Sequence, residues 1–312
     1  METYRFIQLD VFTQEPFAGN ALAVFPEAEG LNDEQMMKIA REMNLSETVF
    51  VLPPRDENTL RRLRIFTPAR EIPFAGHPIV GTWNGLAREG VVPLPDGGNG
   101  WTTIKQEVGI GVLPVDIQFA EGLPSQVVMT QGKFEIVGEV DDGNEQAEIA
   151  RALGLAREDL DESLPIQIIS TGLPFLAVPV RSISDLGRCK VNATLLAEIY
   201  VRAGGTGCLV FSRETLEIND SRAHARMFAP ADNIPEDPAT GSACGALGGY
   251  LVHHGASGVE PEDRKYKFVI EQGDFINRAS RIHLEVTGGT SAIEQVRVGG
   301  YSVLVAKGEV TF

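Results

Sequence analysis

The segment Arg64-Ile-Phe-Thr-Pro-Ala69 is the strongest indication of the fold, because a close copy of it occurs later in the chain. It returns as Arg226-Met-Phe-Ala-Pro-Ala231, 162 positions further on, and Ile72-Pro73 and Ile234-Pro235 keep that spacing. Similar segments in the same order at a constant spacing indicate an internal duplication. The sequence therefore predicts two similar halves.

Each copy continues into an apolar segment behind a glycine, after Gly76-His77 in the first copy and after Gly241-Ser242 in the second. The pattern predicts helices over about 77–89 and 242–254, each followed by a glycine that is typical of a helix end. Both segments are apolar on nearly every side, which is typical of helices buried inside a sheet.

Much of the remaining chain alternates or runs apolar, which predicts strands. The expected strands are 4–12, 109–119, 126–130, 267–271, 281–286, 294–299 and 301–305, with further helices at 33–43, 145–153 and 193–203 and a loop at 93–100. We expect an α+β protein of two pseudo-symmetric domains, 1–125 and 126–300, each a curled and mostly antiparallel sheet around one central helix.

Composition limits the partners. A length of 312 residues suits two domains. The formal net charge of -16 repels polyanions, so nucleic acid is not an expected partner. The best basic cluster, Arg61, Arg62 and Arg64, is better interpreted as one solvated strand face.

Cysteine use and the absence of long apolar runs indicate a cytoplasmic protein. The three cysteines, Cys189, Cys208 and Cys244, form no CxxC pair, and an odd count disfavours a disulfide framework. No signal peptide and no membrane span are expected, since the first residues are not apolar and no run of about 18 apolar residues occurs.

Polar residues gather at the starts of the two central helices: His77 in one half, and Asp237, Thr240 and Ser242 in the other. Pseudo-twofold symmetry would bring two positive helix ends together in a crevice suited to a small carboxylate. Ser242 alone could equally be a helix cap, but a cap does not explain His77 or Asp237.

Glu47 directly precedes the apolar run 48–52. A carboxylate there is either a surface residue at a strand end or a buried acid aimed into a cleft. Burial would raise the pKa of the carboxyl and suit it to proton transfer near neutral pH. Both interpretations stay open on these residues alone.

Three ordered motifs resemble those of the PhzF (phenazine biosynthesis-like) isomerase family. They are Ser46-Glu-Thr-Val-Phe50, Phe66-Thr-Pro-Ala-Arg-Glu-Ile-Pro-Phe-Ala-Gly-His-Pro78 and Glu236-Asp-Pro-Ala-Thr-Gly-Ser-Ala243. The opening strands, with Leu9-Asp-Val-Phe-Thr13 and Phe17-Ala-Gly-Asn-Ala-Leu-Ala-Val24, are also similar to that family's N-terminal strand pair. The resemblance implies the diaminopimelate epimerase-like fold, in which the strand 301–312 crosses back to complete the first domain.

The resemblance also implies a proton shift that needs no metal or organic cofactor. The family's catalytic glutamate falls on Glu47, and its histidine, aspartate and serine fall on His77, Asp237 and Ser242. Backbone amides around Gly76-His77 and Gly241-Ser242, with Thr240 beside them, would hold the substrate's carboxylate. The substrate class is a small cyclic or amino carboxylate, and the family commonly forms homodimers.

Several alternatives compete with this interpretation. A two-thiol racemase of the same fold lacks its second cysteine, since Ile79 stands where the repeat matches Cys244; Cys244 is better explained as a small core residue. A thiol-independent epimerase or racemase, and a non-catalytic small-acid binding protein, remain open. A metal site of His77, His253 and His254 is disfavoured, because adjacent helical histidines point apart. The glycine clusters at 97–100 and 109–111 lack the strand–turn–helix context of a nucleotide site.

Overall fold

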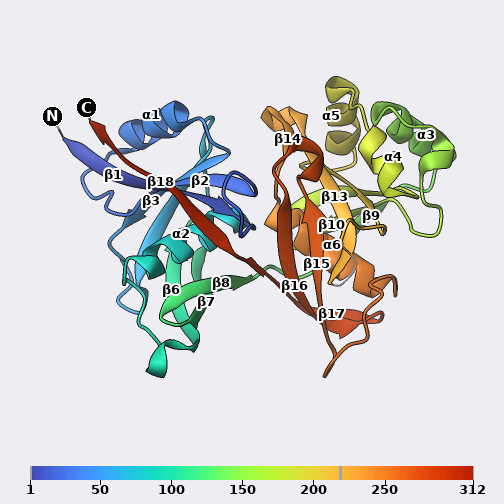
Figure 1. Cartoon of the computed structure of the whole chain (residues 1–312). Coiled ribbons are helices and arrows are strands. Elements are labelled where there is room, and N and C mark those ends of the chain that lie inside the picture. The colour runs from blue at the N-terminus through green and yellow to red at the C-terminus, as the bar shows by residue number, and fades with distance from the viewer. Residues whose placement is uncertain (1, 218–219, 312) are drawn as a thin grey trace. The chain divides into compact units, whose positions relative to one another are not determined.

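The computed structural model describes residues 2–217 and 220–311, and the chain divides into two compact units (Figure 1). Unit 1 comprises Met1–Thr130 with Gly299–Phe312, and unit 2 comprises Gln131–Val298. Within the described residues no helix is long and apolar enough to cross a membrane.

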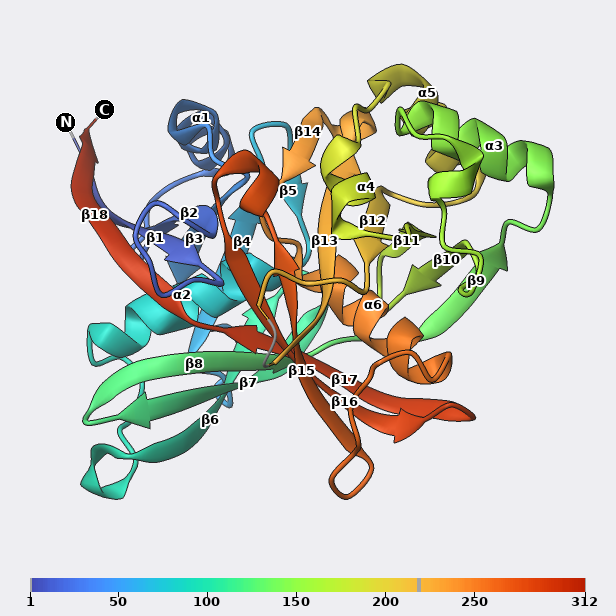
Figure 2. The ribbon, with the colours of Figure 1, turned by 45° about the vertical axis from the view of Figure 1, so that its right-hand side comes forward.

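Unit 1 is a mixed sheet that surrounds one helix, with a second helix outside. Its elements are β1 (Thr3–Val11), β2 (Asn20–Phe25), α1 (Asp33–Met43), β3 (Glu47–Leu52), β4 (Arg61–Phe66), β5 (Glu71–Ile72), α2 (Gly76–Arg88), β6 (Gly100–Val108), β7 (Gly111–Ala120), β8 (Leu123–Thr130) and β18 (Ser302–Thr311). Helix α2 contacts β1, β2, β3, β7, β8 and β18, so strands lie on several sides of it (Figure 2).

Unit 2 repeats this plan and adds outer helices. Its elements are β9 (Glu135–Glu139), α3 (Gly143–Ala152), β10 (Gln167–Ser170), β11 (Pro174–Pro179), α4 (Ile183–Arg188), α5 (Ala193–Arg202), β12 (Cys208–Ser212), β13 (Ser221–Ala229), β14 (Ile234–Asp237), α6 (Gly241–His253), β15 (Lys265–Gln272), β16 (Ser280–Gly289) and β17 (Ala292–Gly300). Short 3-10 turns at 96–98, 157–159, 230–232 and 274–276 complete the two units.

The strand pairing confirms the duplication. In unit 1, β2 pairs in parallel with β3, β4 pairs antiparallel with β3 and β5, and β4 pairs in parallel with β6. Unit 2 repeats the same four pairings: β11 pairs in parallel with β12, β13 pairs antiparallel with β12 and β14, and β13 pairs in parallel with β15. β18 pairs antiparallel with β1.

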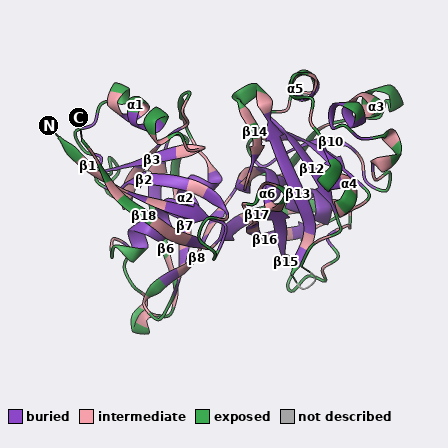
Figure 3. Ribbon diagram, turned by 45° about the horizontal axis from the view of Figure 1, so that its top comes forward, coloured by how far each residue is buried: buried purple, intermediate pink, exposed green. Residues whose placement is uncertain are grey.

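Both central helices are buried, as their apolar sequences predict (Figure 3). Close packing requires small residues on them: a Cβ at Gly81 would lie 2.6 Å from side-chain atoms of Leu22 and Val11. On the other side of the unit 1 sheet, α1 covers an aromatic cluster in which Phe25 stacks on Phe50 at 5.1 Å and Phe66 meets Phe50 edge-on at 5.4 Å. This packing holds the ends of β3 and α2 in place.

The five expected helices lie within two residues of their predicted bounds, α4 was not expected, and some strands were misjudged. α2 and α6 each begin one residue earlier than expected, and Gly90 and Gly255 follow them with left-handed φ values of 77° and 64°. The predicted loop at 93–100 contains a 3-10 turn and ends in β6, which was missed. The strand was hidden because its inward positions include the buried polar Gln106.

Candidate active site

Glu47 and His77 come together at one end of unit 1. Glu47 is the first residue of β3 and pairs with Leu22 of β2, while His77 is the second residue of α2. Nε2 of His77 lies 3.2 Å from Oε2 of Glu47, and the side chains are 6% and 14% exposed. The contact lacks hydrogen-bond alignment, yet it places a carboxyl and an imidazole within reach of proton transfer and largely away from water.

The imidazole of this pair is neutral. Burial lowers the pKa of His77 to about 3, because the charged ring would lose its hydration in the interior. A neutral ring has one nitrogen that donates and one that accepts. With so low a pKa the ring is a poor base and does not carry a charge near neutral pH.

The start of α2 offers backbone amides and no side-chain cap. Its N-cap residue is Ala75, whose methyl group cannot cap the helix, and Pro78 in the first turn has no N–H. The amides of Gly76 and His77 are the first-turn donors that the helix itself leaves without an acceptor. The positive end of the helix dipole adds to their attraction for an anion.

The start of α6 has the same character. Its N-cap is Thr240, which makes no side-chain capping bond, and Ser242 is the second helical residue. The simple alternative that Ser242 is the helix cap is therefore wrong. The amides of Gly241 and Ser242 lie in the first turn, like those of Gly76 and His77 in α2.

Asp237 ends β14 and is 6% exposed. Its Oδ2 accepts the hydroxyl proton of Thr240. Gln272, the last residue of β15, donates through Nε2 to the carbonyl oxygen of Asp237 at 2.7 Å and to Oγ1 of Thr240 at 3.2 Å. Its Oε1 accepts from the backbone N–H of Thr240 at 3.1 Å. The structure thus joins two of the expected site residues through a glutamine that sequence reasoning missed.

Two further polar residues support the α6 start and were also missed. Nε2 of Gln131 donates to the carbonyl of Gly241 at 2.9 Å, and the Thr171 hydroxyl lies 3.3 Å from the carbonyl of Ser242. Both are less than 10% exposed. Gln131 and Thr171 each directly follow a strand, and Gln272 ends one; nothing in the sequence around them marks them as site residues.

The cysteines do not form a thiol pair at the helix starts. Cys244 is buried in α6, its Sγ donates to Oε1 of Gln272 at 3.2 Å, and burial raises the pKa of its thiol. Ile79 occupies the matched place in α2 and is also fully buried. The structure places Cys244 in the core, as expected.

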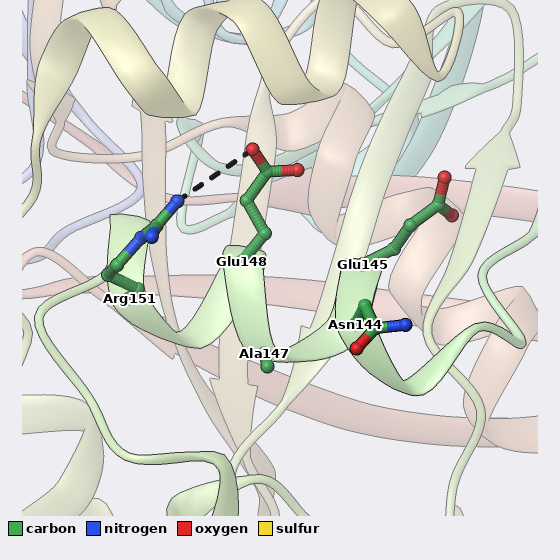
Figure 4. A pocket seen from close by; sticks show the side chains of 5 residues that line it. All are labelled: Asn144, Glu145, Ala147, Glu148 and Arg151. Carbon is green, nitrogen blue, oxygen red and sulfur yellow. Dashed lines mark ion pairs between the residues drawn. The ribbon is translucent and has the colours of Figure 1, made fainter.

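A hollow of about 490 Å³ over α3 holds none of the expected site residues (Figure 4). It is lined by Asn144, Glu145, Ala147, Glu148 and Arg151. Arg151 lies 3.9 Å from Glu148 in an exposed ion pair, which is the ordinary surface pattern of a helix. The hollow therefore contributes nothing to the candidate site.

Two α+β units of one topology, each built around a buried central helix, define the pseudo-symmetric epimerase-like fold class. The model of the phenazine biosynthesis-like (PhzC-PhzF) family matches residues 9–308. The chain belongs to this family, and it is an isomerase.

Similar proteins cover its whole length. An uncharacterized isomerase of Clostridium acetobutylicum is 37% identical over 307 residues, which are 98% of each chain. The trans-2,3-dihydro-3-hydroxyanthranilate isomerase of Pseudomonas aeruginosa is 30% identical over 305 residues, again 98% of each. The crystal structure of a Bacillus anthracis PhzF-family protein covers 100% of both chains with a TM-score of 0.87 and 29% identity.

Proposed function

We propose that this isomerase catalyses a proton shift on a small cyclic or amino carboxylate, with Glu47 as the general acid and base. The observation that carries the proposal is the buried pair in which Nε2 of His77 lies 3.2 Å from Oε2 of Glu47. A neutral imidazole that is a poor base orients the carboxyl group without taking its proton. An ordinary surface glutamate at a strand end has no such partner.

In the proposed reaction the Glu47 carboxylate takes a proton from a tetrahedral carbon next to a double bond that is conjugated with the substrate's carboxylate. The electron pair of the broken C–H bond enters the conjugated system, and the negative charge spreads toward the carboxylate. Protonated Glu47 then returns the proton to another carbon of that system. One C–H bond breaks and one forms with no change of oxidation state, so the reaction requires no oxidant or reductant, and we propose that it proceeds without a metal or organic cofactor.

The helix starts supply the charge sink in this proposal. The amides of Gly76 and His77 and those of Gly241 and Ser242 would donate to the substrate's carboxylate, with Thr240 beside them. The missing side-chain caps on α2 and α6 support this role, because a capped helix start has fewer donors for a ligand. Donors fixed before the reaction stabilise charge that develops in the transition state.

We further propose that the two units are the two expected domains, and that Glu47 and His77 act in the same reaction as Asp237 and Ser242. Asp237 would accept a hydrogen bond from an amino or hydroxyl group of the substrate. Its acceptor role is supported by the Thr240 hydroxyl, which already donates to Oδ2. Ser242 would contribute its amide and its hydroxyl.

The test is proton exchange with solvent. The named activity of the Pseudomonas aeruginosa relative makes trans-2,3-dihydro-3-hydroxyanthranilate the first compound to try. We expect the carboxyl proton of Glu47 to exchange with solvent between the two transfers. In deuterated water the wild type should then incorporate deuterium at the carbon that receives the proton, and Glu47→Gln should abolish both incorporation and turnover while keeping the fold. The matched control is Glu42→Gln, on the exposed face of α1 in the same unit.

Product analysis separates the alternatives. Incorporation with inversion at one carbon and no bond shift would indicate a thiol-independent epimerase, and calorimetric binding without any exchange would indicate a binding protein. Equal incorporation by Glu47→Gln and the wild type would remove Glu47 from the mechanism. We also propose a cytoplasmic homodimer, as the resemblance implies, which light scattering of the purified protein and fractionation of cells test.

A further inference from the structure

We propose that Gln272 is a positioning residue that sets the direction of the hydrogen bonds ending on Asp237, and thereby determines on which carboxyl oxygen of Asp237 a proton is more stable. The inference rests on the proposed role of Asp237 and deepens it. The residues that carry it are Asp237, Thr240 and Gln272.

The two ends of the Gln272 amide are assigned by their neighbours. The backbone N–H of Thr240 can only donate, so the atom that faces it at 3.1 Å is the oxygen, Oε1. The other end lies 2.7 Å from the carbonyl oxygen of Asp237, which can only accept. That end is therefore the NH₂ group, and the reversed amide would place two acceptors together and two donors together.

This orientation determines the role of the Thr240 hydroxyl. The NH₂ group of Gln272 lies 3.2 Å from Oγ1 of Thr240 and has no lone pair to offer, so Oγ1 is the acceptor in that bond. The single proton of the hydroxyl then goes to Oδ2 of Asp237. Oδ2 is held as an acceptor, so a proton that Asp237 takes up is more stable on Oδ1 than on Oδ2.

The residues packed around Gln272 and Asp237 maintain this hydrogen-bond direction. Gln272 is fully buried, so water does not compete for its amide. The segment that carries Asp237 is also held from behind, because the Ser280 hydroxyl lies 2.9 Å from the carbonyl of Pro238. A Cβ at Gly273 would lie 2.5 Å from the same carbonyl oxygen, so only glycine fits there.

Two substitutions of Gln272 distinguish its hold on the Thr240 backbone amide from its effect on the direction of the Thr240 hydroxyl bond. Gln272→Glu keeps an oxygen for the Thr240 N–H and loses the NH₂ donor, so Thr240 is no longer forced to donate to Asp237. Gln272→Met loses both. The matched control is Gln167→Met: Gln167 is 3% exposed in the same unit, and its hydrogen bonds to Glu139 and His254 tie down residues beyond the other end of α6.

With trans-2,3-dihydro-3-hydroxyanthranilate as the probe, Gln272→Glu and Gln272→Met should each lower kcat by about tenfold to a hundredfold, the effect of one lost hydrogen bond to a charged group. KM should change by less than about threefold, because the helix-start amides remain. Thr240→Val should cost about as much as Gln272→Glu, and the double variant no more, since both changes interrupt one chain of hydrogen bonds. Gln167→Met should keep the kcat of the wild type.

Amide hydrogen exchange gives a readout that does not depend on turnover. The Thr240 amide should exchange at least about tenfold faster in Gln272→Met, which removes its acceptor, and near the wild-type rate in Gln272→Glu and Gln167→Met. Wild-type kcat in Gln272→Glu, or additive losses with Thr240→Val, would overturn the inference. If Glu47→Gln stayed active, the proposed function would fall, while the exchange rates would still decide whether Gln272 anchors this segment.

Discussion

Shortening Glu47 by one methylene, in Glu47→Asp, tests whether distance alone limits the reaction. The substitution keeps a carboxylate on β3 and withdraws it by about 1.5 Å, the length of one C–C bond. The present separation of 3.2 Å between Oε2 and Nε2 of His77 would grow to roughly 4.5 Å. The carboxylate would withdraw by a similar distance from the substrate carbon, and a general base works only within about 2.6–3.2 Å of the group whose proton it takes.

A misplacement of about 1 Å can cost about a hundredfold in rate, which corresponds to about 2.7 kcal/mol of activation free energy. We expect that fall in kcat, with KM nearly unchanged because Glu47 is not a donor to the substrate's carboxylate. The free energy of unfolding should drop by only about 1 kcal/mol, for one buried methylene.

The assay is deuterium incorporation from solvent into trans-2,3-dihydro-3-hydroxyanthranilate, run beside urea unfolding and with Glu42→Asp as the control. A kcat within about twofold of the wild type would refute the reasoning, because a carboxylate that works equally well after moving by one bond length is not a positioned base.

Two further predictions concern the framework of the site. Trp83 donates through Nε1 to Oε1 of the fully buried Gln106 at 2.6 Å, so Trp83→Phe should lower the free energy of unfolding by about 2–4 kcal/mol through a lost bond and a stranded acceptor. Adding Gln106→Met should recover part of that loss in urea unfolding; a double variant less stable than Trp83→Phe would contradict this account. Burial opposes ionisation of Glu271, but hydrogen bonds from His224 and from the amides of Leu216 and Glu217 outweigh it and lower its pKa from 4.5 to about 2. The ionised form of Glu271 therefore contributes about 3 kcal/mol of stability above pH 4.5, and this stability is lost as the pH falls toward 2. The urea midpoint of wild-type unfolding should fall across that pH range, and the midpoint of Glu271→Gln should fall less. Parallel curves for the two proteins would contradict the assignment.

Much of the fold could be predicted from the sequence, because short-range residue patterns reveal the duplication. The Arg-x-Phe-x-Pro strands, the glycine-led helices and the glycines that end them are local signals, and the structure places α2 and α6 within one residue of expectation. β6 was missed because Gln106 breaks its alternation, and its polarity makes sense only beside Trp83. Hydrophobic periodicity cannot reveal a strand whose buried position is polar and is satisfied by a partner outside that strand.

The candidate site divides in the same way. Motif resemblance singled out Glu47, His77, Asp237 and Ser242, yet nothing local connects Glu47 with His77 thirty residues on. Their 3.2 Å contact arises because the start of β3 and the start of α2 lie at one end of unit 1. Gln131, Thr171 and Gln272 were not singled out, since a glutamine or threonine at a strand end has no chemical signature until its partners are known.

The two-copy plan, the buried central helices and the residue types at their starts follow from the amino-acid sequence alone, because they depend on the order and period of neighbouring side chains. The folded chain was needed to see that the His77 ring is neutral beside a carboxyl group, that Ser242 does not cap α6, and that Gln272 donates to the Thr240 hydroxyl, which in turn donates to Asp237. Burial and hydrogen-bond direction are properties of groups brought together from distant positions, and no stretch of sequence contains them.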